Sequence, residues 1–208
     1  TEVGGDFYDV LALEDGRLAV AVGDVAGHGV SSGLVMSMAK SALAVQVTFN
    51  PEVAAVFVTL NRMVFQSARK RLLATLCYAL IDPVRREMRF ASAGHLFPYR
   101  ISRLGKVESL ESVAYPLGVR EALDIDSHTA KLEPGDIIFL CSDGVVEARR
   151  EGSDEHFGFD RLEEVLAKFG GHGASVVRDK VLAALETFTQ GAEREDRSHR
   201  EDSRRPRL

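Results

Sequence analysis

The residues of this sequence that could do chemistry are acidic and lie close to glycine. Asp6 and Asp9 belong to the segment Gly4–Asp9, whereas Asp24 and Asp143 each follow an apolar run. Glycine allows the backbone to approach a ligand closely. A carboxylate at the end of a core strand is poorly solvated, and no Arg or Lys adjoins Asp24 or Asp143 in the sequence. These acids therefore need a partner from elsewhere.

A divalent cation is one such partner. Carboxylate and carbonyl oxygens without an accompanying set of His or Cys favour Mg²⁺ or Mn²⁺ over Zn²⁺. A single Gly-Asp pair after a strand is more often a turn or capping aspartate. Two aspartates beside glycine at strand ends, Asp24 after Gly23 and Asp143 before Gly144, together with Gly4-Gly5-Asp6 favour the metal interpretation.

The first half of the chain predicts a strand and two helices around Asp24. Residues 17–24 form an apolar run typical of a buried strand. Residues 31–47 predict a helix that is capped by Ser31 or Ser32. A second helix is predicted from Asn50-Pro51-Glu52. The expected buried positions are Leu34, Met38, Ala42 and Val45 in the first helix, and Val53, Val56, Phe57, Leu60 and Val64 in the second.

The second half predicts mostly antiparallel strands and then two more helices. Residues 72–82 and 87–93 are expected to form a hairpin around Asp82-Pro83. Further strands are predicted at 96–101, 107–110, 122–132 and 137–141, and helical spacing appears over 159–169 and 177–188. This order predicts an α+β fold instead of an alternating βαβ sheet.

Composition narrows the class of protein. The chain has 208 residues, a net charge of -5 and 45% hydrophobic residues, which suits one globular domain without the broad basic surface that nucleic acid or an anionic membrane needs. No apolar run approaches the roughly 18 residues that a membrane span requires. Cys77 and Cys141 lie in apolar runs, as expected for reduced core thiols in the cytoplasm. The missing initial Met suggests a fragment of a longer protein.

Five motifs in this order resemble the metal-dependent (PPM or 2C-like) serine/threonine protein phosphatases, in particular the bacterial branch of stage II sporulation protein E and sigma-factor regulators. The motifs are Gly4–Asp9, Gly23–Gly29, Ser92–His95, Pro116–Gly118 and Ser142–Ala148. The resemblance extends over roughly residues 2–192. It implies a four-layer α-β-β-α sandwich, in which two antiparallel sheets are flanked by helix pairs.

The resemblance also implies a site for two Mn²⁺ or Mg²⁺ ions. Asp24 would bridge both ions, Val25 would offer its carbonyl oxygen, and Asp143 would bind the second ion. Asp6 would bind directly or through a water. His28 could protonate the leaving serine oxygen, although a helix cap or an anion contact is an equally plain role for Gly-His-Gly.

The C-terminal region departs from the family pattern. The family ends with a pair of acids and an apolar edge strand, whereas residues 193–208 are highly charged and were expected to be a disordered tail after a domain over 1–192. Asp196 is the first candidate for the missing metal ligand, followed by Glu195 and Asp202. Without the strand, the ligand would be poorly anchored.

The sequence therefore leads to two functional hypotheses. The first is a cytoplasmic phosphatase that removes phosphate from serine or threonine of a protein, by resemblance an anti-sigma-factor antagonist, through water activated by two metals. The alternative is a pseudophosphatase that binds phosphoproteins without turnover. Neither involves nucleic acid or a membrane, a homodimer is left open, and the helices around 31–48 and 51–69 are the expected docking surface.

Overall fold

The larger sheet carries most of the predicted motifs. In the computed structural model, which describes residues 4–67 and 72–202, this sheet has five strands in the order β1-β2-β3-β4-β7, and all neighbours are antiparallel. Their bounds are β1 Phe7–Ala12, β2 Leu18–Val25, β3 Ala74–Asp82, β4 Glu87–Ala93 and β7 His128–Lys131. The strand ending at Asp24 and the β3–β4 hairpin are confirmed. The strand predicted over 122–132 is wrong in extent, because only its last part forms β7.

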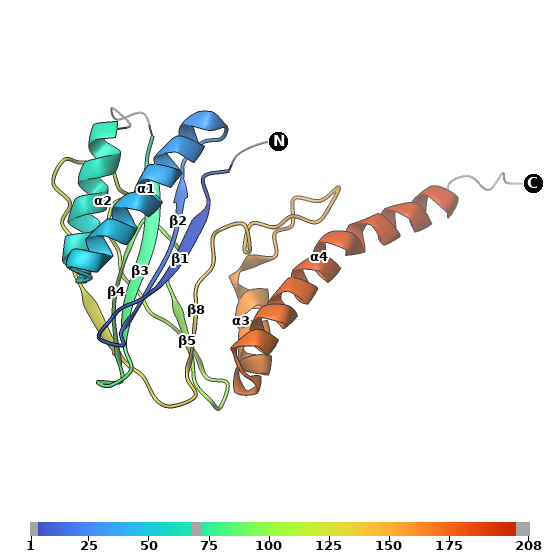
Figure 1. Cartoon of the computed structure of the whole chain (residues 1–208). Helices are drawn as coiled ribbons and strands as arrows, with labels where there is room; N and C mark the ends of the chain where they lie inside the picture. Colours follow the sequence, from blue (N-terminus) through green and yellow to red (C-terminus); the bar gives the residue numbers. More distant parts are fainter. Residues whose placement is uncertain (1–3, 68–71, 203–208) are drawn as a thin grey trace, which may run out of the picture. The chain divides into compact units, whose positions relative to one another are not determined.

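Helices α1 (Val30–Phe49) and α2 (Val53–Ser67) cover one face of this sheet (Figure 1). The predicted stripe of α2 is confirmed, since all five of its positions are buried. Asn50 accepts a hydrogen bond from the backbone N–H of Glu52 at 3.0 Å, which shapes the turn before α2. This turn leaves Pro51 outside the helix, which begins at Val53.

The predicted buried face of α1 is wrong. Leu34 and Val45 are 60% and 59% exposed, whereas the buried positions are Ser32, Gly33, Val35, Ala39, Leu43 and Val47. The helix is apolar on several sides, so periodicity alone does not choose the face that packs on the sheet. The predicted cap is also wrong, because Gly29 is the N-cap and the Ser32 hydroxyl donates to the Gly29 carbonyl at 3.0 Å.

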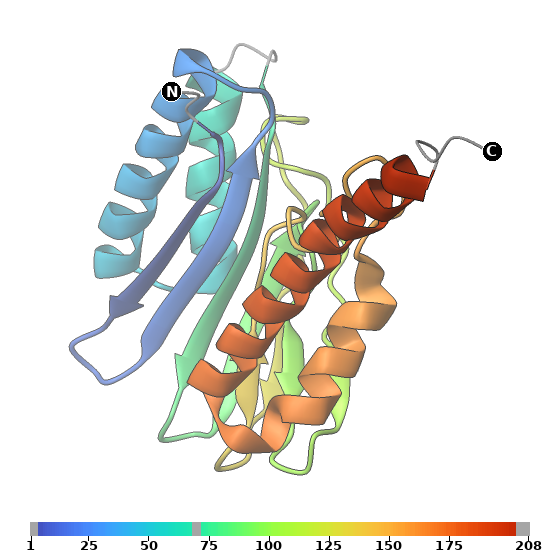
Figure 2. The same ribbon diagram turned by 90° about the vertical axis from the view of Figure 1, so that its right-hand side faces the viewer.

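The remaining elements form a second sheet and a helix pair. The sheet has the order β6-β5-β8, and helices α3 and α4 run side by side (Figure 2). The bounds are β5 Tyr99–Ile101, β6 Val107–Ser109, β8 Ile137–Phe139, α3 Gly158–Phe169 and α4 Ala174–Asp202, with a 3₁₀ turn at Gly170–His172. A Cβ at Gly105 or Gly170 would lie 2.6 Å from the Ala167 carbonyl oxygen or 2.3 Å from Ile101, so glycine allows the β5–β6 turn to pack on the helices.

The chain divides into two compact units. The first comprises residues 1–99, 109–134 and 138–142, and the second comprises 100–108, 135–137 and 143–208. The predicted α+β fold with two antiparallel sheets and four helices is confirmed. Helix α4 continues to Asp202, past the predicted domain end at 192. The side chains of residues 191–202 and all of 203–208 lie outside the described residues, and the boundary at 192 stays a prediction.

The structure bears on two expectations from composition, which concern the cysteines and the length of apolar segments. Cys77 is buried and Cys141 half-buried, and the structure pairs neither of them in a disulfide. Burial raises the pKa of the Cys77 thiol to about 12. The expectation about apolar length is wrong for α1, since Val30–Phe49 is long and apolar enough to cross a membrane. Core helices of soluble proteins can have the same length and composition.

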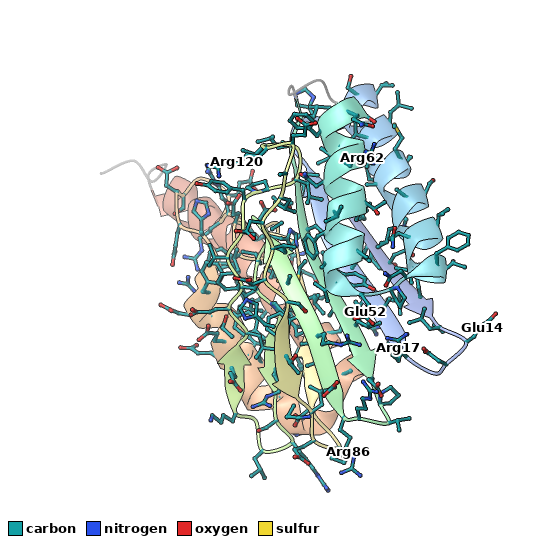
Figure 3. The ribbon with its side chains drawn as sticks, turned by 90° about the vertical axis from the view of Figure 1, so that its left-hand side faces the viewer. Glu14, Arg17, Glu52, Arg62, Arg86 and Arg120 are labelled. Atoms are coloured by element: carbon teal, nitrogen blue, oxygen red, sulfur yellow. The ribbon has the colours of Figure 1, made fainter. Side chains whose placement is uncertain are left out.

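An ionic network fastens the α1–α2 junction to the sheet at the end where β2 begins. Arg17 and Glu52 lie close together in Figure 3, and their Nη1 and Oε1 atoms are 3.2 Å apart. Arg89 of β4 pairs with the same Glu52 carboxylate, and Asp15 pairs with Arg17 at 2.7 Å. The network anchors the helix pair at the start of β2, which is the end of the strand opposite to Asp24.

Candidate active site

The start of β1 and the end of β2 bring three of the predicted site residues together. Phe7 is paired with Gly23, so Asp6 precedes β1 next to the place where Asp24 ends β2. The Val25 N–H donates a hydrogen bond to the Gly5 carbonyl at 3.2 Å. A Cβ added to Gly5 would lie 2.1 Å from the Val25 carbonyl oxygen and 2.6 Å from Asp24 Oδ1. Both oxygens therefore lie against Gly5, and only the absence of a side chain at position 5 allows this close approach.

Strand β3 supports Asp24 from the other side. Thr75 is the partner of Asp24 in the antiparallel register, and its hydroxyl donates to the Asp24 carbonyl at 3.5 Å. The same hydroxyl shares a hydrogen bond of 2.8 Å with His95 Nδ1. The Ser92 hydroxyl donates to the His95 carbonyl at 2.7 Å, so the turn after β4 is fixed as well. His95 is thus a hydrogen-bonded histidine beside the Asp24 strand.

The fifth motif reaches this site through Ser142. The Ser142 hydroxyl donates to Asp6 Oδ2 at 3.4 Å, and Asp143 is the next residue of the chain. Asp143 is exposed and begins a turn in which the Glu147 N–H donates to the Asp143 carbonyl at 2.8 Å. Asp143 belongs to the second compact unit, so its role as a ligand stays a prediction.

His28 lies in the turn between β2 and α1. It is exposed, and its neighbours Gly27 and Gly29 have φ angles of 97° and 85°, which favour glycine. These two residues allow the chain to turn sharply within a few residues of Asp24. The turn leaves the imidazole exposed to solvent, where a substrate can reach it.

The proposed ligand set is only partly assembled in what the structure describes. Asp196 lies on the helical backbone of α4, and its side chain is outside the described residues, as are those of Glu195 and Asp202. Among the described side chains, no group of three or more His, Cys, Asp or Glu residues is close enough to hold a metal ion. The part that is assembled consists of Asp6, Asp24 and the Val25 carbonyl.

These groups fit a hard divalent cation. The predicted donors at the β1–β2 end are oxygens, and one carboxylate oxygen and one carbonyl oxygen lie together against Gly5. Oxygen-only donor sets favour Mg²⁺ and Mn²⁺. The chemistry of these donors agrees with a site for such an ion.

Sequence reasoning missed two side chains that hold this site in place. Thr75 lies far from Asp24 in the sequence, and only the β2–β3 register shows that the two residues are partners. Ser142 belongs to the fifth motif, but the sequence gives no sign that its hydroxyl contacts Asp6. Strand β1 was also not predicted.

A comparison with family models decides the relationship. The model described as "Stage II sporulation protein E (SpoIIE)" matches residues 14–198, which is most of the chain. The chain belongs to the stage II sporulation protein E family. This finding confirms the resemblance carried by the five motifs.

Individual members and fold neighbours of the SpoIIE family agree. Phosphoserine phosphatase RsbU of Bacillus subtilis is 31% identical over 151 residues, which is 72% of this chain and 45% of RsbU. The RsbU and RsbW domains of Rv1364c from Mycobacterium tuberculosis give a TM-score of 0.73 at 28% identity, covering 89% of this chain and 52% of that one. The SiaA-PP2C domain of Pseudomonas aeruginosa gives a TM-score of 0.77 at 23% identity, covering 90% and 75%. This chain spans less than half the length of the curated relatives it matches.

Proposed function

We propose that this chain is a phosphatase that hydrolyses phosphoserine or phosphothreonine in a protein, with two Mn²⁺ or Mg²⁺ ions bound at the β1–β2 end. The observation that carries the proposal is the arrangement at Gly5, where Asp24 Oδ1 and the Val25 carbonyl oxygen lie together against the glycine, within the motifs Gly4–Asp9 and Gly23–Gly29. The name of the relative RsbU, a phosphoserine phosphatase, supports the reaction. RsbX, whose solved structure is a complex with magnesium, has a related fold, with a TM-score of 0.63 at 17% identity.

Each residue has a proposed role. Asp24 and the Val25 carbonyl bind metal, Asp6 assists them, and Asp143 and Asp196 complete the ligands of the second ion. When bound, the ions supply the positive charge that makes a water nucleophilic and that offsets charge on the phosphate. Thr75 holds the Asp24 backbone, and the hydrogen bond from the Val25 N–H to Gly5 holds the carbonyl of Val25 in place.

His28 is proposed to donate a proton to the leaving serine oxygen. It is exposed and lies within the same motif as Asp24, and a histidine can carry this proton near neutral pH. No nucleophilic side chain is required by such a mechanism. Replacing His28 with Gln should therefore lower turnover most for substrates with a poor leaving group, such as a phosphoserine peptide, and least for p-nitrophenyl phosphate.

The proposed substrate is a phosphorylated protein of a sigma-factor pathway. This follows from the family of regulators to which the chain belongs and from its RsbU relatives. The charge of -5 gives no reason to add nucleic acid as a partner. We propose a cytoplasmic location, and we assign the segment no membrane contact.

Metal-dependent turnover tests the proposal directly. Phosphate release from a phosphoserine peptide and from p-nitrophenyl phosphate is measured while Mn²⁺ is raised from a chelated level to millimolar. Asp143→Asn and Asp196→Asn should abolish or strongly lower turnover, while an unchanged far-ultraviolet circular dichroism spectrum shows that both variants are folded. Asp154→Asn is the matched control, because Asp154 lies in an exposed turn away from any motif.

The same experiment separates the alternative. A folded protein without turnover at any Mn²⁺ concentration, and without a two-site Mn²⁺ isotherm in calorimetry, would support the pseudophosphatase instead. Undiminished activity of Asp143→Asn would contradict the assignment of that ligand.

A further inference from the structure

The long connection between β6 and β7 is fastened to the sheet by backbone hydrogen bonds. The Ala74 N–H donates to the Leu117 carbonyl at 3.1 Å, and the Leu117 N–H donates back to Ala74 at 2.8 Å. The Gly94 N–H donates to the Ala114 carbonyl at 3.0 Å. The segment 113–120, which we call the anchored loop, therefore has a fixed path over the ends of β3 and β4.

A buried amide on α2 is used entirely to hold this loop. Asn61 is only 2% exposed, and its Nδ2 donates to the Arg120 and Glu121 carbonyls at 3.0 and 3.1 Å. Its Oδ1 accepts a hydrogen bond of 2.9 Å from the Gly118 N–H. Gly118 has a φ of +86°, and a Cβ there would lie 2.7 Å from Val64. The buried amide and the tight turn together make the loop rigid before any ligand binds.

The anchored loop lies at the end of the sheet that bears Asp24. Ala74, which bonds Leu117, is the register partner of Val25, the residue after Asp24. Figure 3 shows Arg120 at this end, whereas Arg86, in the β3–β4 turn, lies at the opposite end. A protein bound with its phosphoserine at Asp24 therefore passes close to the loop.

The loop presents an aromatic side chain and a cation to solvent. The Arg120 guanidinium carbon lies 4.2 Å from the centroid of the Tyr115 ring, and Tyr115 is 55% exposed. Across the part of the chain that the structure describes, Arg120 forms no ion pair, so its N–H groups can meet an anion. A hollow of about 550 Å³ beside this pair is also lined by Asp124 and Asp126.

We propose that the Tyr115–Arg120 pair is a docking contact for the polypeptide that flanks the phosphoserine of the substrate. The Arg120 guanidinium would pair with one acidic side chain of the substrate, and the Tyr115 ring would pack against an apolar one. This inference rests on the proposed phosphatase function. Tyr and Arg are among the residue types that dominate the binding energy of protein interfaces, and a loop already held in place lowers the entropic cost of binding.

The charges around the pair restrict the partner further. Asp124 and Asp126 line the same hollow as Arg120, so a run of acidic residues would be repelled there. A single acidic residue opposite Arg120 pairs with the guanidinium and avoids the repulsion that a run of acids would meet from Asp124 and Asp126. The substrate is therefore expected to carry one acidic residue near its phosphoserine, within an otherwise neutral or apolar stretch.

A charge-swap binding experiment tests the contact. Fluorescent peptides in which a phosphonate that cannot be hydrolysed replaces the phosphate of phosphoserine carry one Glu or one Lys, placed in turn at each flanking position, and their Kd values are measured by anisotropy with Mn²⁺ present. At one position or more, the unmodified protein should bind the Glu peptide about tenfold more tightly than the Lys peptide. Arg120→Glu should reverse this preference, and Tyr115→Ala should weaken both peptides about fivefold.

Arg86→Glu is the matched control, because it makes the same change of charge on an exposed residue at the other end of the sheet. It should leave the Glu to Lys preference unchanged. The same preference in Arg120→Glu as in the unmodified protein, or no preference at any position, would overturn the docking contact. Hydrolysis of p-nitrophenyl phosphate with Mn²⁺ is measured separately, so a failure of the phosphatase function is distinguished from a failure of docking.

Discussion

Replacing Gly5 with Ala probes the proposed metal site without replacing a charged residue. The added methyl would lie 2.1 Å from the Val25 carbonyl oxygen and 2.6 Å from Asp24 Oδ1. Gly5 is not in the left-handed region, so alanine adopts its backbone conformation without strain. The substitution therefore tests space alone. Gly4→Ala is the matched control, because the nearest atom to its methyl is the Asp6 nitrogen at 4.0 Å.

The geometry sets the size of the effect. Protein Cβ atoms essentially never approach another heavy atom within 3.0 Å, so the Val25 carbonyl must retreat by about 0.9 Å, from 2.1 to 3.0 Å. Metal ligands tolerate displacements of about 0.2 Å. A misplacement near 1 Å in a reacting centre costs about 100-fold in rate. Crowding of a packed site costs about 1–3 kcal/mol in the free energy of unfolding.

The assay follows metal binding and turnover together. We expect Gly5→Ala to weaken Mn²⁺ binding in calorimetry by at least about tenfold and to lower hydrolysis of p-nitrophenyl phosphate by about 100-fold. Gly4→Ala should stay within about twofold of the unmodified protein for both quantities. Urea unfolding shows whether Gly5→Ala is still folded. A folded Gly5→Ala with unchanged Mn²⁺ affinity would refute the placement of the metal beside Val25 and Asp24, and equal losses in both variants would show that space is not the cause.

Three further predictions concern stability. Leu43→Ala in α1 should lower the free energy of unfolding by about 2–5 kcal/mol in urea, whereas Leu34→Ala should change it by no more than about 0.5 kcal/mol, because the first side chain is fully buried and the second 60% exposed; equal costs would contradict the observed face of the helix. Asn61→Ala leaves the buried Gly118 N–H without its acceptor, which should cost about 1–3 kcal/mol and open the anchored loop to limited proteolysis; an uncleaved loop would show that other contacts hold it. Burial raises the pKa of Cys77 from 9.0 to about 12, so the unfolded chain loses this proton first and stability should fall as the pH rises from about 9 towards 12; a Cys77→Ser variant with the same decline in urea midpoints would contradict this cause.

Helix α2 was predictable from the sequence and the packing of α1 was not. In α2 the buried residues Val56, Leu60 and Val64 recur at helical spacing and polar residues separate them, so one face is marked. In α1 apolar side chains occupy the solvent side as well, including Leu34 at 60% exposure and Phe49 at 83%. The choice between two apolar faces depends on the shape of the sheet beneath, which a single sequence does not record.

Strand β1 was hidden for a related reason. Its inward side includes Asp9, which lies 3.5 Å from Lys40 of α1, whereas its outward side carries Tyr8 and Val10 at 72% and 56% exposure. The alternation of apolar and polar residues therefore indicates the wrong face. The pairing of β1 with β2 depends on backbone hydrogen bonds. The ion pair of Asp9 joins β1 to the distant Lys40 of α1. Neither interaction leaves a periodic signal.

The predicted acids were found from their neighbours in sequence, whereas their supports were not. Asp6, Asp24 and Val25 belong to short motifs in which glycine marks a close approach. Thr75 and Asn61 act on residues that are remote in the chain, at Asp24 and at Gly118. Their roles follow only from the strand register and from the path of the anchored loop, both of which are properties of the folded chain.

Two glycines also explain how β1 and β2 come close enough to place Asp6 beside Asp24. A Cβ on Gly23 would lie 2.6 Å from the Thr75 carbonyl oxygen and 2.8 Å from the Phe7 ring, so Phe7 can cross its register partner only because that partner has no side chain. Gly5 plays the same part beside Val25. Because side chains alternate between the two faces of a strand, a slip of one residue would bring a side chain into each of these spaces. The absence of side chains at positions 5 and 23 therefore selects the register that places Asp6 and Asp24 on neighbouring strands. The positions of these two acids are thus fixed by the backbone and not by their charges.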